Sequence, residues 1–452
     1  MKLRFITSLT TLAIASLVIS ACGATPTTAP TQSAAPTTAP ATEAPTATVQ
    51  PTDTAAAATA TETPTTAATA AATSAATAAA TSTSLKVGLI LVGPYNDKGW
   101  NQANYEAMQY VTQKDPNVTF DYVDKVNSSD RPNTTGAQVA DDLIAKGAKL
   151  IIFDSDDFKD DALATAKKYP NIPIIHTSGD YSWKDGKNYK NQNNLINIMG
   201  QMEYGKMMAG CAAALGTQTG KIGFLGPLIN DETRRLADSA YLGAKYCWTT
   251  YLKKDAKALQ FKVTWIGYWF NIPGVTLDPT KVADDFFNGG YDVVISSIDT
   301  PEAATEAKKI AASGKNVKYV HYDYKNGCDL APDVCLGAAY FNWGPAYLDA
   351  AHKAMAGTLT QYFAWNPPDW KDINNPDTSA VGFIEGKALG DKKSIEDQFI
   401  KGLGDGSIDL FKGPLYLQDG SLYLKDGEQA TPQQIWYMPQ LLQGMEGASS
   451  SK

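Results

Sequence analysis

Aromatic and acidic side chains directly follow many of the segments that this sequence pattern marks as buried β-strands. The residues in these positions are Tyr95–Trp100, Asp154–Asp157, Pro227, Trp269–Phe270, Ser297–Asp299, Asp323 and Asn342–Trp343. In open parallel sheets, ligands bind beyond the carboxyl ends of the strands. Flat apolar rings beside a few acceptors suit a planar heterocycle that carries N–H or hydroxyl donors. The pattern therefore predicts a binding site for a flat, polar small molecule.

Short apolar runs alternate with helical patterns, and these elements would position the candidate side chains. The expected strands are 86–92, 119–123, 150–153, 172–176, 195–199, 221–225, 261–268, 293–296, 317–322 and 336–341, and the clearest helices are 203–215, 232–251, 282–288, 302–312, 345–355 and 395–403. A hairpin is expected about Asp419-Gly420. Such alternation requires right-handed crossovers and parallel sheets. We therefore expect an α/β fold with two doubly wound parallel-sheet lobes and a ligand in the cleft between them.

Motifs for catalysis or metal binding are missing from the sequence. It contains no G-x-S-x-G elbow, no Walker loop and no H-E-x-x-H motif. The acidic cluster in Asp154–Asp161 lacks the glycine and glutamate of an EF-hand loop, so a solvated loop and helix start is the preferred interpretation. The histidines, His176, His321 and His352, show no metal-ligand spacing. We expect a protein without enzymatic activity, metal or cofactor.

The composition of the 452 residues indicates three parts: a targeting signal, a tether and a folded region. Lys2 and Arg4 precede an apolar run, which is typical of a secretory signal over residues 1–22. Residues 23–84 are nearly all Ala, Thr, Pro and Ser and predict a disordered tether. Residues 85–447 can form a sizeable core. The net charge of −8 argues against nucleic acid, because duplex binding depends on Lys and Arg that neutralise phosphates.

Four cysteines lie in the part expected to fold: Cys211, Cys247, Cys328 and Cys335. In an exported chain they could form disulfides in three pairings. The turn residues between Cys328 and Cys335 favour a local bridge, and Cys211 and Cys247 would then join two neighbouring helices. Zinc is the alternative, but no pair has C-x-x-C spacing.

Several segments in register resemble the basic membrane protein (BMP) family, the purine-nucleoside-receptor type of ABC-transporter substrate-binding lipoprotein. Gly93–Gln102 resembles the first cleft loop of that family, whose common form is Asn-Asp-Lys-Ser-Phe-Asn-Gln. Other matching segments are Ala166–Pro170, Glu203–Gly210, Thr219–Phe224, Asn342–Pro345, Phe411–Pro414 and Trp436-Tyr437. The likeness covers about residues 85–447. Ile19–Cys22 also resembles a bacterial lipobox, which implies that Cys22 is diacylated; ordinary signal cleavage with an incidental Cys22 is the alternative.

The resemblance implies a type I periplasmic-binding-protein fold that delivers a nucleobase or nucleoside, with purines favoured, to ABC permease subunits. Trp100 takes the place of the aromatic that stacks on the base, with Asp97 and Asn101 beside it. Asp323 matches the acidic residue that accepts from ribose hydroxyls, and Trp269 or Phe270 corresponds to a second aromatic. Asp154, Asn342 and Trp343 complete the candidate ligand-binding set. The family further implies an exported protein, lipid-anchored to the outer face of the bacterial cytoplasmic membrane.

One position departs from the family pattern. Many nucleoside-binding members carry Lys before the Asn that corresponds to Asn342, and this chain has Phe341. If that Lys contacts the ligand, its replacement favours a bare nucleobase or another aromatic solute over a ribonucleoside.

For most of these residues the alternative is a purely structural role. Trp100 could pack against the hydrophobic core and Trp343 at the hinge. Asp97 could be the N-cap of the helix that begins near Trp100, and Asp323 could cap a helix or a turn. We expect one lobe of about 85–200 plus 331–380 and a second of about 201–330 plus 381–447. The alternatives in function are a receptor of the same fold for a sugar or other small solute, and an adhesive or signalling surface lipoprotein without a transport role.

Overall fold

The computed structural model of the chain describes residues 83–451. The expected signal sequence, the lipidation site Cys22 and nearly all of the tether over 23–84 lie outside the described residues. Among the described helices, none is long and apolar enough to span a membrane.

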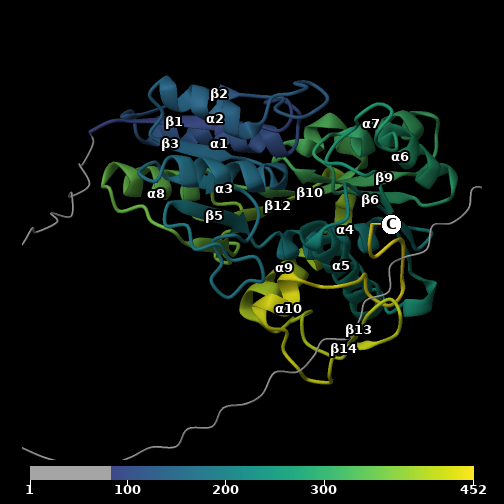
Figure 1. Cartoon of the computed structure of the whole chain (residues 1–452). Helices are drawn as coiled ribbons and strands as arrows, with labels where there is room; N and C mark the ends of the chain where they lie inside the picture. Colours follow the sequence, from purple (N-terminus) through teal and green to yellow (C-terminus); the bar gives the residue numbers. More distant parts are fainter. Residues whose placement is uncertain (1–82, 452) are drawn as a thin grey trace, which may run out of the picture. The chain divides into compact units, whose positions relative to one another are not determined.

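The first sheet consists of six parallel strands in the order β11-β5-β4-β3-β1-β2. In chain order these strands are β1 (Leu85–Ile90), β2 (Val118–Val123), β3 (Leu150–Phe153), β4 (Ile174–His176), β5 (Leu195–Gly200) and β11 (Phe363–Asn366). The helices that cover it are α1 (Trp100–Lys114), α2 (Gly136–Ala145), α3 (Lys159–Lys168) and α8 (Gly344–Met355). We call this sheet with its helices the first lobe (Figure 1).

Alternate residues of the first-lobe strands enter opposite layers of the core. Leu150 and Ile152 of β3 belong to a cluster with residues of α1 and α8, whereas Ile151 and Phe153 belong to a cluster with residues of α2 and α3. Both layers are buried because helices cover both faces of the sheet, and the strands are therefore continuous apolar runs in the sequence.

The second sheet has seven strands in the order β12-β10-β9-β8-β6-β7-β15. Its strands are β6 (Lys221–Gly226), β7 (Gln260–Trp265), β8 (Val293–Ser296), β9 (Lys318–Asp323), β10 (Cys335–Phe341), β12 (Val381–Glu385) and β15 (Met445–Glu446). Only the β10–β12 pair among them is antiparallel. The covering helices are α4 (Met202–Gly216), α5 (Asp231–Tyr246), α6 (Pro279–Asn288) and α7 (Glu302–Ala312), and these elements form the second lobe (Figure 1).

The C-terminal part of the chain adds smaller elements to the second lobe. Helix α9 (Lys393–Asp405) contacts α4, and α10 (Pro432–Trp436) contacts α5. The expected hairpin about Asp419-Gly420 is present as β13 (Leu415–Tyr416) and β14 (Leu422–Leu424).

The chain passes between the two sheets three times, after β5, after β10 and between β11 and β12. Two hydrogen bonds tie these passages together, from Gln201 N to Asn366 O at 2.7 Å and from Asn342 N to Ala380 O at 3.0 Å. This finding corrects one part of the expected lobe division, which assigned residues 331–380 to the first lobe. Strand β10 instead pairs with β9 in the second sheet, because only a short connection separates these two parallel strands.

The structure contains the disulfides Cys211–Cys247 and Cys328–Cys335. The first joins α4 to the π-helical turn that follows α5, and the second closes the connection between β9 and β10. The helix expected over 232–251 is α-helical only to Tyr246, because Cys247–Tyr251 form the π-helical turn. Likewise, the strand expected to reach residue 268 ends at Trp265, two residues before Gly267, whose φ of 103° is left-handed.

Candidate ligand-binding site

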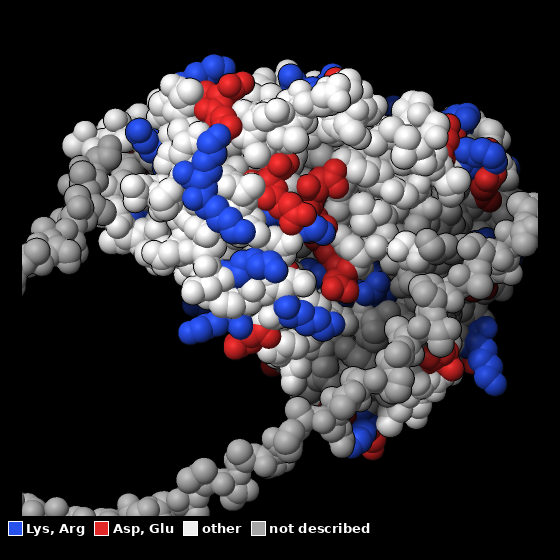
Figure 2. Space-filling view, in the orientation of Figure 1, with Lys and Arg blue, Asp and Glu red and all other residues white. Residues whose placement is uncertain are grey.

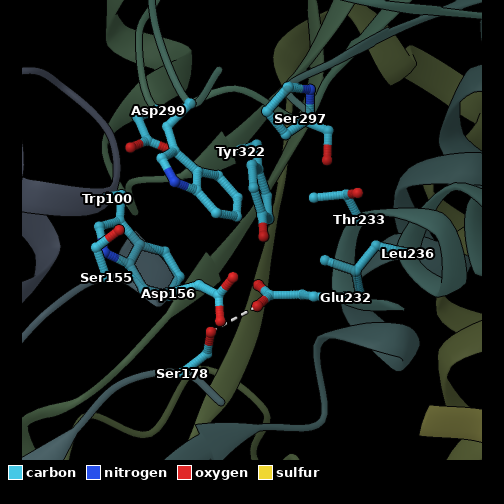
Figure 3. A pocket seen from close by; sticks show the side chains of 12 residues that line it. Trp100, Ser155, Asp156, Ser178, Glu232, Thr233, Leu236, Ser297, Asp299 and Tyr322 are labelled. Atoms are coloured by element: carbon cyan, nitrogen blue, oxygen red, sulfur yellow. Dashed lines mark hydrogen bonds between the residues drawn. The ribbon is translucent and has the colours of Figure 1, made fainter. Parts of the chain in front are cut away.

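A pocket lies between the two lobes at the carboxyl ends of their strands (Figure 3). About 360 Å³ of space, part of it open to solvent, lies among its lining residues, and about 10 Å³ of that space admits the centre of a water molecule. Its lining residues are Trp100, Ser155, Asp156, Ser178, Pro227, Glu232, Thr233, Leu236, Trp269, Ser297, Asp299 and Tyr322. The position is the one at which open parallel sheets bind their ligands.

Trp100 is the first residue of α1 and presents part of its indole to the pocket (Figure 3). Its Nε1 donates to the backbone carbonyl of Asp154, which follows β3. The rings of Phe341 and Trp343 meet it edge-on, each with a centroid distance of 5.3 Å. These contacts fix the plane of the indole before any ligand arrives.

Asp97 and Asn101 organise the loop that presents Trp100. Asp97 accepts hydrogen bonds from the backbone N–H groups of Gly99, Asn101 and Gln102 and from Asn101 Nδ2. Asn101 Oδ1 in turn accepts from Gly93 N at 2.7 Å. Both side chains are buried, and neither lines the pocket.

Gly99 lies where the first lobe meets the second. A Cβ at this position would be 1.8 Å from the backbone oxygen of Asp299, so no larger residue fits without movement of the backbone. Only glycine permits this close approach.

Trp269 and Phe270 reach the site from the loop after β7, and only Trp269 lines the pocket. The backbone oxygen of Trp269 accepts from Asp299 N at 3.0 Å. Both rings belong to a hydrophobic cluster with residues of β3, α2 and α3 in the first lobe. The loop therefore supplies a pocket wall and an apolar contact between the lobes.

Several buried carboxyl groups lie in or near the pocket: Glu232 and Asp299 line it, whereas Asp97, Asp154 and Asp323 do not. Burial raises the pKa of Glu232 to about 7 and that of Asp97 to about 6. Burial also raises the pKa values of Asp154, Asp299 and Asp323 well above the usual range for aspartate, and neighbouring acidic groups add to the effect. Glu232 is consequently partly protonated near neutral pH and can donate as well as accept hydrogen bonds.

Asp323 ends β9 in an unusual conformation. Its φ is 68°, in the left-handed region, and neither carboxyl oxygen finds a hydrogen-bond partner among the described residues. The second oxygen of Asp154 is likewise unpartnered there, while the first accepts from Val92 N at 2.9 Å.

Lys206 is a buried basic residue near the pocket, although it does not line it. Its Nζ donates to the backbone oxygen of Ser296 at 2.9 Å and lies 3.2 Å from the centroid of the Tyr322 ring. Burial lowers the pKa of Lys206 well below its ordinary value, and the charges of Asp323 and Glu232 oppose that shift.

Asn342 and Trp343 do not line the pocket. Asn342 Nδ2 donates to the backbone oxygens of Pro376 and Ser379, at 3.0 and 2.7 Å, and so holds the passages between the lobes. Trp343 stacks on Phe341 at a centroid distance of 4.6 Å and supports Trp100 from behind. Its indole N–H has no partner among the described residues.

The model of the Bmp family, described as ABC transporter substrate-binding protein PnrA-like, matches residues 84–366. The chain belongs to this family. It is 26% identical over 369 residues to a purine-binding protein of Brucella abortus, covering 80% of this chain and 93% of that protein. A Haloferax volcanii protein, named as a possible ABC transporter glucose-binding protein, is 24% identical over 240 residues, or 52% of this chain and 54% of its own length.

Solved structures share the fold of this Bmp-family chain. A solute-binding protein of an ABC transporter system from Conexibacter woesei aligns with a TM-score of 0.51 at 16% identity, covering 72% of this chain and 98% of its own. One from Aeropyrum pernix aligns with a TM-score of 0.56 at 13% identity, covering 72% and 92%. The predicted fold class, two doubly wound lobes of the periplasmic-binding type, is confirmed.

Sequence reasoning missed much of the lining of this Bmp-family pocket. Ser178 follows β4, and its position after a predicted strand is a signal that the sequence does contain. Glu232, Thr233 and Leu236 come from the start of α5. A position after a strand end does not mark residues on helices, so the helix residues that face the cleft carry no such signal.

Proposed function

We propose that this chain is a lipid-anchored, extracytoplasmic receptor that captures a purine nucleobase or nucleoside between its lobes and presents it to an ABC importer. The family membership supplies the transport role. The observation that carries the ligand class is the pair of indoles, Trp100 and Trp269, that line one pocket together with Tyr322. Stacking on an aromatic side chain is worth about 1–3 kcal/mol per base.

Unpartnered acceptors beside the aromatic walls support a ligand with N–H or hydroxyl donors. A left-handed aspartate costs about 1–3 kcal/mol, and surrounding structure maintains such strain mostly at functional sites. Asp323 combines that conformation with two unpartnered oxygens, so we assign it the role of ligand acceptor. Asp154 and Asp299 are further acceptors in the proposed site.

The choice between a base and a nucleoside depends on the surroundings of Phe341. Its ring stacks on Trp343 and packs edge-on against Trp100, so it belongs to the support of the aromatic wall. Lys206 is buried behind Tyr322 and does not line the pocket. The site as it stands holds about 10 Å³ of free volume, so binding of a purine, with or without a sugar, requires the lobes or side chains to move apart. The Brucella relative that is named purine-binding supports this ligand class.

A binding panel tests the proposal. Small molecules that remain bound through native purification are identified by mass spectrometry, and purines, pyrimidines, nucleosides and sugars are then compared in thermal-shift assays. A ligand at 100 times its Kd stabilises the folded protein by about 2.7 kcal/mol. Stabilisation by purines supports the proposal. Stabilisation by sugars alone, the result expected for the alternative solute receptor, overturns the ligand class.

A further inference from the structure

A second, more polar hollow adjoins the aromatic pocket. About 170 Å³ of it admits the centres of water molecules, and it shares Asp156, Ser178 and Glu232 with that pocket. These three side chains lie together at one side of the close-up view, where Ser178 Oγ donates to Glu232 Oε2 at 2.6 Å (Figure 3). The hydrogen bond joins the two lobes and separates the two compartments.

Arg235 lines the polar hollow and is fully buried. Its guanidinium lies 3.9 Å from the centroid of the Trp436 ring, and its Nε donates to Glu203 Oε1 at 2.5 Å. Both terminal nitrogens, Nη1 and Nη2, lack a hydrogen-bond partner among the described residues. Buried donors of this kind are rarely left unsatisfied in folded proteins, and a planar guanidinium offers its N–H groups in a fixed fork.

The other charges around the hollow select against an anion. Four of its lining residues are acidic, Asp156, Asp180, Asp231 and Glu232, and only Lys159 and Arg235 are basic. Acidic side chains also gather near the middle of the face shown in Figure 2. A negatively charged group would be repelled, whereas hydroxyl groups can accept from Arg235 and donate to the carboxylates.

We propose that this hollow is a second binding site for an uncharged, hydroxyl-rich group such as a sugar ring. Arg235 supplies two donors toward adjacent oxygens, and Asp180 and Glu232 supply acceptors. The sugar can be a free monosaccharide or the sugar part of a larger ligand, since both present the same hydroxyl chemistry.

Two measurements on the full-length chain separate these sources. Saturation-transfer NMR with D-ribose, D-glucose and D-ribose 5-phosphate reports a free sugar. Calorimetric titration with hypoxanthine and inosine tests for a sugar attached to a base. The ratio of the two affinities measures what the ribose of inosine contributes to binding. The test variant combines Arg235→Gln with Glu203→Gln, because removal of one partner alone would leave a buried charge uncompensated.

We expect the parent chain to show saturation transfer to the neutral sugars, tighter binding of inosine than of hypoxanthine, or both. The double variant should lose each effect that the parent shows. Lys168→Gln, which removes an exposed charge from the other end of α3 outside the hollow, is the control and should lose neither. If the double variant fails to fold, Asn188→Phe fills the hollow from an exposed position and should cause the same loss.

The proposal is overturned if the parent chain shows neither effect, if the double variant retains them, or if the control loses them equally. Binding of the phosphorylated sugar alone would also overturn it, because the site would then select anions. Transfer to free sugars without any binding of hypoxanthine or inosine would contradict the base-binding function proposed above and leave this second site supported.

Discussion

At the scale of single residues, the orientation of Trp100 determines how an aromatic ligand can stack in the pocket. Trp100 is fixed by a hydrogen bond to the Asp154 carbonyl and by edge contacts with Phe341 and Trp343, so its face toward the pocket is preorganised. Little side-chain freedom remains to be lost on binding, and this preorganisation makes a stacked ligand bind more tightly.

Replacement of Trp100 by leucine tests this role. Trp100→Leu keeps apolar volume against Phe341 but removes the stacking surface, so we expect purine affinity to fall about 10- to 100-fold. Isothermal titration with the purine that binds the parent chain measures the change. Trp370→Leu, the same substitution outside the pocket, is the control and should leave the affinity unchanged. Equal affinities in Trp100→Leu and the parent would mean that Trp100 only packs.

The buried carboxyl of Glu232 predicts a pH dependence. Its pKa is about 7 in the folded chain against an ordinary value of 4.5, so the folded state binds more protons than the unfolded state between these values. The stability that it contributes is full below pH 4.5 and is lost as the pH rises through 7. The free energy of unfolding should therefore fall by about 3 kcal/mol more in the parent than in Glu232→Gln over this range.

Urea unfolding of both proteins at several pH values measures this difference. The glutamine retains an acceptor for Ser178 and does not titrate, so the remaining acidic groups cancel in the comparison. Parallel stability curves across pH 5 to 8 would refute the assignment of a raised pKa to Glu232.

Residue types after predicted strands could place Trp100, Trp269, Asp154 and Asp323 near the cleft. They could not show that Asp97, Asn101 and Asn342 use their polar atoms within the protein, because such bonds depend on how loops fold. Arg235 and Lys206 look like ordinary surface residues in the sequence. Their burial follows from the packing of α4 and α5, and no local pattern encodes it.

At the scale of elements, the α4–α5 pair is the close-packed core of the second lobe. A Cβ on Gly210 would be 1.9 Å from the Ala240 oxygen, and one on Gly243 would be 2.0 Å from the Met207 oxygen, so both glycines permit the helices to approach. Elements with strong apolar periodicity, such as β3, β8 and α7, were predicted with their observed bounds. Strands β11 and β12 were not predicted, because they flank a segment rich in Pro, Asn and Asp.

The disulfides predict different losses of stability. Cys211–Cys247 closes a separation of 36 residues, and Cys328–Cys335 closes one of 7. Loop-closure entropy predicts a cost of about 4 kcal/mol for removing the first and about 2.5 kcal/mol for the second. Urea unfolding of the two double Cys→Ala variants checks the order, and each serves as the control for the other. A larger loss from the short loop would contradict the entropic account.

At the scale of the whole binding domain, a few polar contacts hold the two lobes together around the pocket. Gln102 Nε2 donates to Tyr324 OH at 3.0 Å, and His321 Nε2 lies 2.8 Å from the Lys98 oxygen. Tyr268 OH donates to Asp157, and Trp269 Nε1 lies 3.4 Å from the same carboxylate. The expected cleft and its closure thus depend on the loop after β7, whose reach over the first lobe could not be foreseen from its sequence.

Loss of the Tyr268 hydroxyl should loosen this closure without altering the aromatic walls. A hydrogen bond to a charged group contributes about 1.5–3 kcal/mol, so Tyr268→Phe should raise the ligand dissociation rate by about 10-fold or more and leave the association rate nearly unchanged. Stopped-flow measurement of tryptophan fluorescence gives both rates. Tyr169→Phe is the matched control, because that hydroxyl donates to Asp141 within the first lobe and should affect neither rate. A slower association with unchanged dissociation would show that the Tyr268–Asp157 contact guides ligand entry and does not hold the lobes closed.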